Sequence, residues 1–159
     1  MELSLKPDYR EFIAENIGIA FLFVLSVVAM PYSTHFGLWY VSMLSLVLSM
    51  GLAFLLLVRY IILTSVVWII SEDTLCRIKG VFSRRTDYVE LYRVVDYEES
   101  QTFLQKLMKI KSVTIISTDK SDSTMQMYGI DASYDLVRLI RSRVEKCKTE
   151  RRIYEITNR

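Results

Sequence analysis

The chain has 159 residues, which allows about one domain in addition to any membrane segment. It carries 20 Lys and Arg residues against 18 Asp and Glu residues, and this interspersed charge, with no recognition motif, argues against nucleic-acid binding. One histidine and two cysteines without metal-ligand spacing offer no site for a metal, and we expect no cofactor.

The chain has two unlike parts. Residues 16–58 contain no Asp, Glu, Lys or Arg, whereas charged residues are frequent from Arg59 onward. A helix needs about 20 residues to cross the hydrocarbon core of a bilayer, so the uncharged stretch is too long for one span and fits two. The sequence therefore predicts transmembrane helices over about 16–33 and 38–58, joined by a turn that begins at Pro31.

The second predicted span has the flanks of a membrane helix and one face of small residues. Aromatic and basic residues at its ends are typical membrane-interface anchors, and these are Trp39, Tyr40, Arg59 and Tyr60. The small residues recur at every fourth position and are Ser45, Ser49 and Ala53. Such a stripe predicts close helix packing, either on the first span or on another copy of the chain.

The positive charges predict how the spans are oriented. The loop between them contains no Lys or Arg, while both outer flanks do, and positively charged flanks remain in the cytoplasm. We therefore expect both termini to be cytoplasmic, with residues 1–15 forming an N-terminal arm. A cleaved signal peptide is the alternative for the first apolar segment, but no small-x-small cleavage site ends it.

The part that follows Arg59 has the pattern of strands. The run "YIILTSVVWIIS" is too short for a third span and rich in β-formers, so it predicts a strand over about 65–70. In "LCRIKGVF" the alternation predicts Cys76 and Ile78 on the buried face of a strand. Two short strands with a bend near Leu91 follow, and "SVTIIST" and "STMQMYGI" predict two more, joined by a turn at 119–122.

Two helices complete this predicted α+β domain, which we place over residues 61–148. Apolar spacing predicts a short helix that starts at Phe103, and an amphipathic helix ends the domain, capped by Asp131 or Ser133. The predicted buried face of that last helix consists of Leu136, Val137, Ile140, Val144 and Cys147. Residues 149–159 are a tail or an extension of the helix, and both cysteines are expected to be reduced.

The order of these elements resembles a known family. The turn "SED" and the stretch "LCRIKGVFSRRTDYVELYRVVDYEESQTFLQKLMKIKSVTIIST" are similar to the membrane-anchored bacterial pleckstrin-homology (PH-like) domain family, over about residues 59–147. The resemblance implies two nearly orthogonal antiparallel sheets, a β-sandwich or barrel, capped by a C-terminal α-helix. It usually implies seven strands, of which six are recognised here, so the strand number stays open. It also implies a non-catalytic interaction module at the bacterial inner membrane.

Basic residues form the one site-like signal in the predicted domain. They lie on the first hairpin and on the short helix, and they are Arg77, Lys79, Arg84, Arg85, Lys106 and Lys109. They either contact anionic lipid head groups or a partner, or they are an ordinary solvated surface. The turn over residues 71–74 is acidic where a phosphoinositide pocket would need cations, which argues against such a pocket.

The sequence does not favour catalysis. The predicted domain contains no histidine, Cys-x-x-Cys pair or glycine-rich phosphate loop. Our hypothesis is an inner-membrane protein whose PH-like domain binds protein partners or other copies of itself. The alternative is an immunity or accessory factor, or a subunit of a transport or secretion assembly, recognised through its transmembrane helices.

Overall fold

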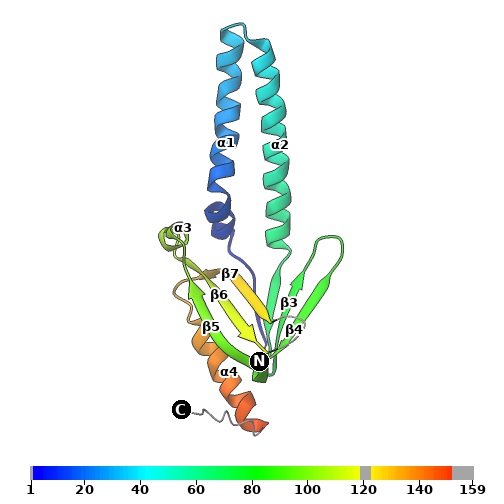
Figure 1. Ribbon diagram of the computed structural model, residues 1–159, viewed down its shortest axis with the longest axis vertical. Helices are drawn as coiled ribbons and strands as arrows, with labels where there is room; N and C mark the ends of the chain where they lie inside the picture. The colour runs from blue at the N-terminus through cyan, green and yellow to red at the C-terminus, as the bar shows by residue number, and fades with distance from the viewer. Residues whose placement is uncertain (1, 119–122, 152–159) are drawn as a thin grey trace. The chain divides into compact units, whose positions relative to one another are not determined.

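The computed structural model describes residues 2–118 and 123–151, and the chain divides into two units (Figure 1). One unit is a helical hairpin, Phe12–Leu63. The other combines residues 1–11 with residues 64–159 and is called the β domain below. The turn predicted at 119–122 and most of the predicted tail lie outside the described residues.

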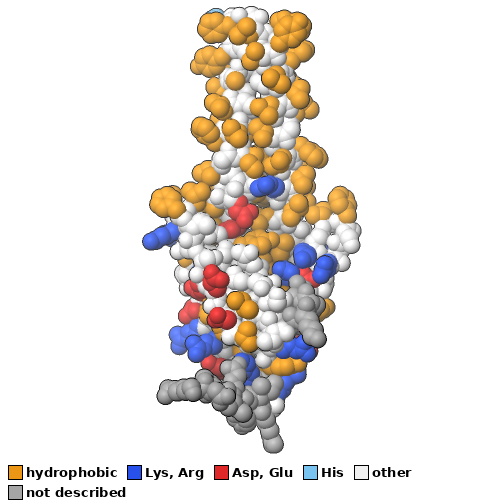
Figure 2. Space-filling model, viewed as in Figure 1, with side chains coloured by type: hydrophobic (Ala, Val, Ile, Leu, Met, Phe, Trp, Pro, Cys, Tyr) orange, Lys and Arg blue, Asp and Glu red, His pale blue; other side chains and the backbone are white. Residues whose placement is uncertain are grey.

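The helical hairpin consists of α1 (Tyr9–His35) and α2 (Trp39–Thr64). At about 1.5 Å per residue each helix is roughly 40 Å long, more than the hydrocarbon thickness of about 30 Å. Both helices are long and apolar enough to cross a membrane, and hydrophobic side chains cover the hairpin face seen in Figure 2. The helices extend beyond the predicted spans, since α1 begins at Tyr9 and α2 continues to Thr64.

The prediction that the first helix breaks at Pro31 is wrong, because α1 continues through this residue to His35. Proline removes one backbone donor, but hydroxyl groups supply additional local hydrogen bonds. The Ser33 hydroxyl donates to the carbonyl of Met30 at 2.9 Å, and the Thr34 hydroxyl donates to the carbonyl of Pro31 at 2.8 Å. The chain reverses at Gly37, where φ is 71°, a conformation that favours glycine.

The β domain contains two antiparallel sheets, with strand orders β1-β2-β3-β4 and β5-β6-β7 among the described residues. The strands are β1 (Leu3–Leu5), β2 (Val67–Ile70), β3 (Thr74–Lys79), β4 (Arg85–Glu90), β5 (Val94–Ser100), β6 (Ile110–Ser117) and β7 (Thr124–Asp131). The short 3-10 helix η1 (Leu91–Arg93) forms the predicted bend between the sheets. In the described part of the chain no ladder joins the sheets, so the sandwich stays open.

The strand that sequence reasoning left unassigned is β1, which precedes both long helices. It pairs antiparallel with β2, and Leu3, Ser4 and Leu5 lie opposite Ile70, Ile69 and Trp68. Leu3 and Leu5 are partly buried and pack against the core. The helical hairpin is therefore inserted between the first and second strands of the β domain.

The core lies between the sheets and α4 (Leu136–Glu150), which confirms the predicted α+β class with a C-terminal helix. Leu136, Ile140, Val144 and Cys147 are buried as predicted, and Val137 packs at the edge of the core. The predicted caps are wrong. The carboxylate of Asp135 accepts the N–H of Arg138 at 3.1 Å, whereas Asp131 accepts the Ser133 N–H in the preceding turn.

Candidate interaction surfaces

The β3–β4 hairpin carries its basic residues on the face opposite to the one that the sequence predicted. In the register of the hairpin Leu75 lies opposite Val89, Arg77 opposite Asp87 and Lys79 opposite Arg85. Leu75 and Val89 are fully buried, so Arg77 and Lys79 follow them along the core face. Cys76 and Ile78 are half-buried on the other face. The prediction that Cys76 and Ile78 face the core is wrong. The charged residue Arg77 lies on the core face instead, because it pairs there with the buried Asp87.

Asp87 is the centre of this hairpin. Its side chain is only 2% exposed, and it receives Arg77 Nη2 at 2.7 Å, Lys79 Nζ at 3.0 Å and Arg85 Nε at 2.8 Å. Burial raises the pKa of Asp87, but hydrogen bonds from these three cations outweigh it and hold the pKa well below its usual range. We call these four residues the Asp87 cluster. Three cations against one carboxylate leave it positively charged.

The turn between β3 and β4 exposes apolar side chains. Gly80 adopts a φ of 120°, and a Cβ at this position would collide with the carbonyl oxygen of Ser83, so the turn requires glycine. Val81 is 46% exposed and Phe82 is fully exposed. Arg84, the residue before β4, is also exposed.

The short helix α3 (Phe103–Leu107) is fixed on its inner side by the N-terminal segment. A capping box forms between Thr102 and Gln105, and the buried Gln105 amide donates to Glu11 at 2.8 Å and to Ser112 at 3.0 Å. Glu11 is only 2% exposed. Sequence reasoning missed Glu11, because nothing in the sequence distinguishes it from a solvated charge next to a span.

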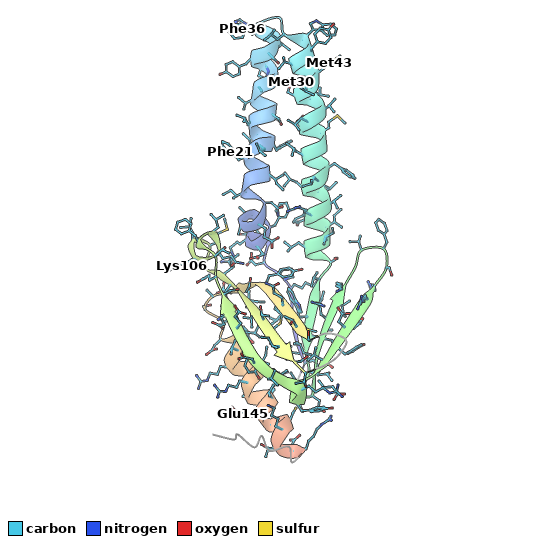
Figure 3. The ribbon with its side chains drawn as sticks, in the orientation of Figure 1. Phe21, Met30, Phe36, Met43, Lys106 and Glu145 are labelled. Atoms are coloured by element: carbon cyan, nitrogen blue, oxygen red, sulfur yellow. The ribbon has the colours of Figure 1, made fainter. Side chains whose placement is uncertain are left out.

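The outer side of α3 is apolar and basic. Phe103 is 81% exposed and Leu107 is 71% exposed. Lys106 lies between them in sequence and is exposed (Figure 3). Lys109, also exposed, lies between α3 and β6 and has a φ of 56°, which turns the chain into β6.

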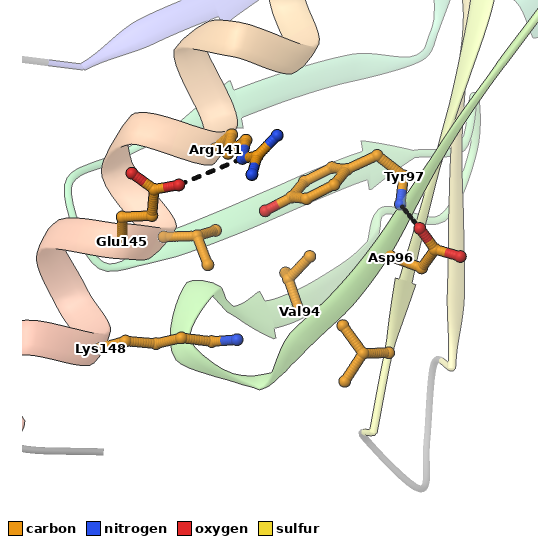
Figure 4. Close-up of a pocket in the computed structure, with 8 residues that line it drawn as sticks. Val94, Asp96, Tyr97, Arg141, Glu145 and Lys148 are labelled. Atoms are coloured by element: carbon orange, nitrogen blue, oxygen red, sulfur yellow. Dashed lines mark hydrogen bonds and ion pairs between the residues drawn. The ribbon is translucent and has the colours of Figure 1, made fainter. Parts of the chain in front are cut away.

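A groove of about 440 Å³ lies between β5 and α4 (Figure 4). The residues that line it are Val94, Val95, Asp96, Tyr97, Arg141, Val144, Glu145 and Lys148. Tyr97 points from β5 toward α4, where Arg141 and Glu145 form an ion pair at 3.1 Å. Among the described strands β5 pairs only with β6, so it is a sheet edge. None of the predicted site residues lines this groove, since it forms from segments that are distant in sequence.

The helical hairpin places its predicted residues in different settings. Ser45 is buried, Ser49 is half-buried and Ala53 is exposed, so the small-residue stripe turns from the interior of the hairpin to its surface. A shallow apolar cavity of about 310 Å³ lies between the helices, with Leu25, Ser45 and Leu48 among its lining residues.

The predicted membrane anchors occupy the two ends of α2. Trp39 and Tyr40 are exposed, with ring centroids 3.8 Å apart. At the other end Arg59 Nη1 donates to Asn16 Oδ1 at 3.0 Å. The Tyr60 ring lies edge-on to the Phe12 ring, with the ring centroids 5.4 Å apart. The Asn16–Arg59 bond gives the one basic side chain at this level of the hairpin a polar partner.

The described residues contain no group of three or more His, Cys, Asp and Glu side chains that could hold a metal. Both cysteines are free thiols. Burial, together with a hydrogen bond to Asp73, raises the pKa of Cys147 to about 11, and burial also raises the pKa of Cys76. Reactive cysteines have lowered pKa values, so these thiols are suited to packing and not to nucleophilic attack.

Comparison with known proteins identifies one family. A family model described as "Bacterial PH domain" matches residues 17–144. The match begins within α1 and ends within α4, so it includes most of α1, all of α2 and six of the strands. No curated protein matches the chain, and no solved structure matches it either.

Proposed function

Because the chain belongs to the bacterial PH domain family, we propose that it is a membrane-anchored interaction module whose β domain binds a protein partner at the groove between β5 and α4. A PH domain is generally non-catalytic, and the raised thiol pKa values fit this role. The anchor is the helical hairpin, placed in the bacterial inner membrane.

The pairing of β1 with β2 supports the cytoplasmic placement of both termini. Residues 3–5 precede the two spans and β2 follows them, yet the strands share one sheet. This shared sheet supports a placement of the two segments on the same side of the membrane, as two crossings would give. The positive-inside rule then places that side in the cytoplasm.

The observation that carries the proposal is a groove beside a sheet edge. An extended segment of a partner can add to an edge strand through main-chain hydrogen bonds, while neighbouring pockets receive its side chains. Val94 and Val144 are buried core residues at the groove, and charged residues such as Arg141 and Lys148 also line it. A volume of about 440 Å³ is within the usual range of binding sites.

Photo-crosslinking in the full chain tests this groove. We expect p-benzoylphenylalanine at Val95, a groove residue that is 54% exposed, to form an adduct with one protein species in native membranes. The matched control is Tyr88 on β4, which is 61% exposed and does not line the groove. Arg141→Glu should weaken the adduct, whereas Arg138→Glu on the same helix should not. Equal adducts at Val95 and Tyr88, or no protein adduct, would contradict the proposal.

A second candidate function places recognition in the spans, and the apolar cavity between α1 and α2 favours it. Ala53→Leu separates the two functions, because Ala53 is exposed on the hairpin and the substitution leaves the groove untouched. If the groove binds the partner, we expect the Val95 adduct to persist at its original yield. Loss of the adduct, with the chain still in the membrane, would favour recognition by the spans or self-association through them.

A further inference from the structure

We propose that the β domain rests directly on the lipid bilayer, with two apolar tips inserted among the head groups. The first tip is the β3–β4 turn with Val81 and Phe82, and the second is the outer side of α3 with Phe103 and Leu107. This inference rests on the membrane anchoring proposed above. It assigns a role to residues that the groove between β5 and α4 does not use.

Both tips expose large apolar side chains to solvent. Phe82 is fully exposed, Phe103 is 81% exposed and Leu107 is 71% exposed. Scattered apolar residues on a surface are ordinary, but three of this size on two projecting elements form sites suited to contact with an apolar phase. Aromatic rings in particular favour the interface between head groups and hydrocarbon.

The connectivity of the chain holds the first tip near the membrane. Val67, at the start of β2, pairs with Ile78, which is followed closely by the β3–β4 turn. Only two residues separate Val67 from Thr64, the last residue of α2. At about 3.6 Å per extended residue, this link is at most about 11 Å long.

The second tip is fixed to the residues that lead into the first span. Arg10 Nη1 donates to the carbonyl of Met108 at 2.9 Å, and Glu11 accepts from the amide of Gln105 at 2.8 Å, so the start of α1 fixes α3. The uncharged stretch of α1 begins five residues after Glu11 at Asn16, a helical rise of about 7.5 Å. The head-group layer on each side of a bilayer is roughly 5–8 Å thick, so α3 is within its reach.

Positive charge lies next to both tips and complements anionic lipid head groups. Lys106 and Lys109 are exposed on and after α3. Arg84 lies two residues after Phe82 and is exposed, and Lys79 and Arg85 flank the same turn. Basic residues held at a membrane surface gain free energy from anionic lipids.

Photo-crosslinking to lipid tests the docking. The full chain, with p-benzoylphenylalanine at Phe82 or at Phe103, is reconstituted in vesicles of phosphatidylethanolamine and phosphatidylglycerol, irradiated, and weighed by intact mass spectrometry. We expect adducts with the mass of one lipid at both positions. The matched control is Val95, which is 54% exposed at the far end of β5 from α3 and should give a several-fold lower yield. Vesicles of phosphatidylcholine should lower the yields at the tips.

Four other outcomes are possible, and each would overturn one part of the proposal. Lipid yields at Phe82 and Phe103 no higher than at Val95 would overturn the docking while leaving the anchor intact. A protein adduct at Phe82 would overturn a lipid occupant for that tip. Equal tip yields in the two kinds of vesicle would overturn the role of the basic residues. Release of the chain from the vesicles by sodium carbonate would overturn the membrane anchor itself. This extraction therefore distinguishes failure of the proposed function from failure of the docking.

Discussion

A fragment of residues 64–151 is expected to be much less stable than the same fragment with residues 2–11 joined ahead of it by a flexible Gly/Ser linker. The shorter fragment lacks β1, so it loses the partly buried Leu3 and Leu5 and the ladder on β2. It also lacks Glu11, which leaves the buried Gln105 amide without that acceptor. Together these losses amount to about 3 kcal/mol of unfolding free energy.

Urea denaturation followed by far-UV circular dichroism measures the difference. The linked fragment should unfold cooperatively at a clearly higher urea concentration. A linked fragment with Leu3→Ser and Leu5→Ser is the matched control, because it keeps the chain length and removes the apolar contacts. It should unfold near the midpoint of the short fragment. Equal midpoints for the short and linked fragments would show that β1 is dispensable.

Gly129 offers an independent check of the same contact. Its φ is 66°, and a Cβ there would lie 2.9 Å from the amide nitrogen of Asp8 and 3.0 Å from Cβ of Glu11. Gly129→Ala should destabilise the short fragment by about 1–2 kcal/mol, the cost of a left-handed alanine. The linked fragment should lose more, because the methyl group also displaces residues 8–11. Equal losses in both fragments would mean that the N-terminal segment does not pack at Gly129.

The sequence predicted the elements whose periodic pattern is long enough to read. The strands from Val67 to Asp131 alternate over four or more residues, and α4 repeats its apolar face over more than three turns. The strand β1 has only three residues and stands before two apolar helices, so its pattern carries no period. Its partner β2 lies on the far side of those helices, and only the fold brings the two together.

The candidate sites were harder to predict because they depend on tertiary partners. The alternation of β3 predicts Arg77 and Lys79 on the face away from the core, but in the structure they lie on the core face and pair with Asp87 of the adjacent strand. The groove combines Val95 of β5 with Lys148 of α4, which share no local motif. The sequence also does not show whether Phe82 and Phe103 are buried or exposed, since phenylalanine is common in protein cores. Only the fold shows that both are exposed.

Asp87→Ala is expected to destabilise the β domain by about 3 kcal/mol. The change removes the carboxylate that Arg77, whose side chain is only 16% exposed, shares with Lys79 and Arg85. Removing one partner of a buried ion pair costs about 3–5 kcal/mol, and the lower end applies because Arg85 remains largely in water. Glu98→Ala, an exposed acid on β5, is the matched control and should change stability by less than about 0.5 kcal/mol.

The pH dependence distinguishes a charge effect from a packing effect. The folded pKa of Asp87 lies below the ordinary value of about 3.9, so its stabilisation is fully present above that value and is lost as pH falls through the folded pKa. The difference in urea midpoint between the parent and Asp87→Asn should therefore be constant from pH 5 to 8 on this reasoning and should shrink below about pH 4. Asn keeps the shape of the side chain, so a difference that does not change with acid would assign the loss to packing and hydrogen bonding. An Asp87→Asn variant as stable as the parent at pH 7 would show that the three cations do not need the carboxylate.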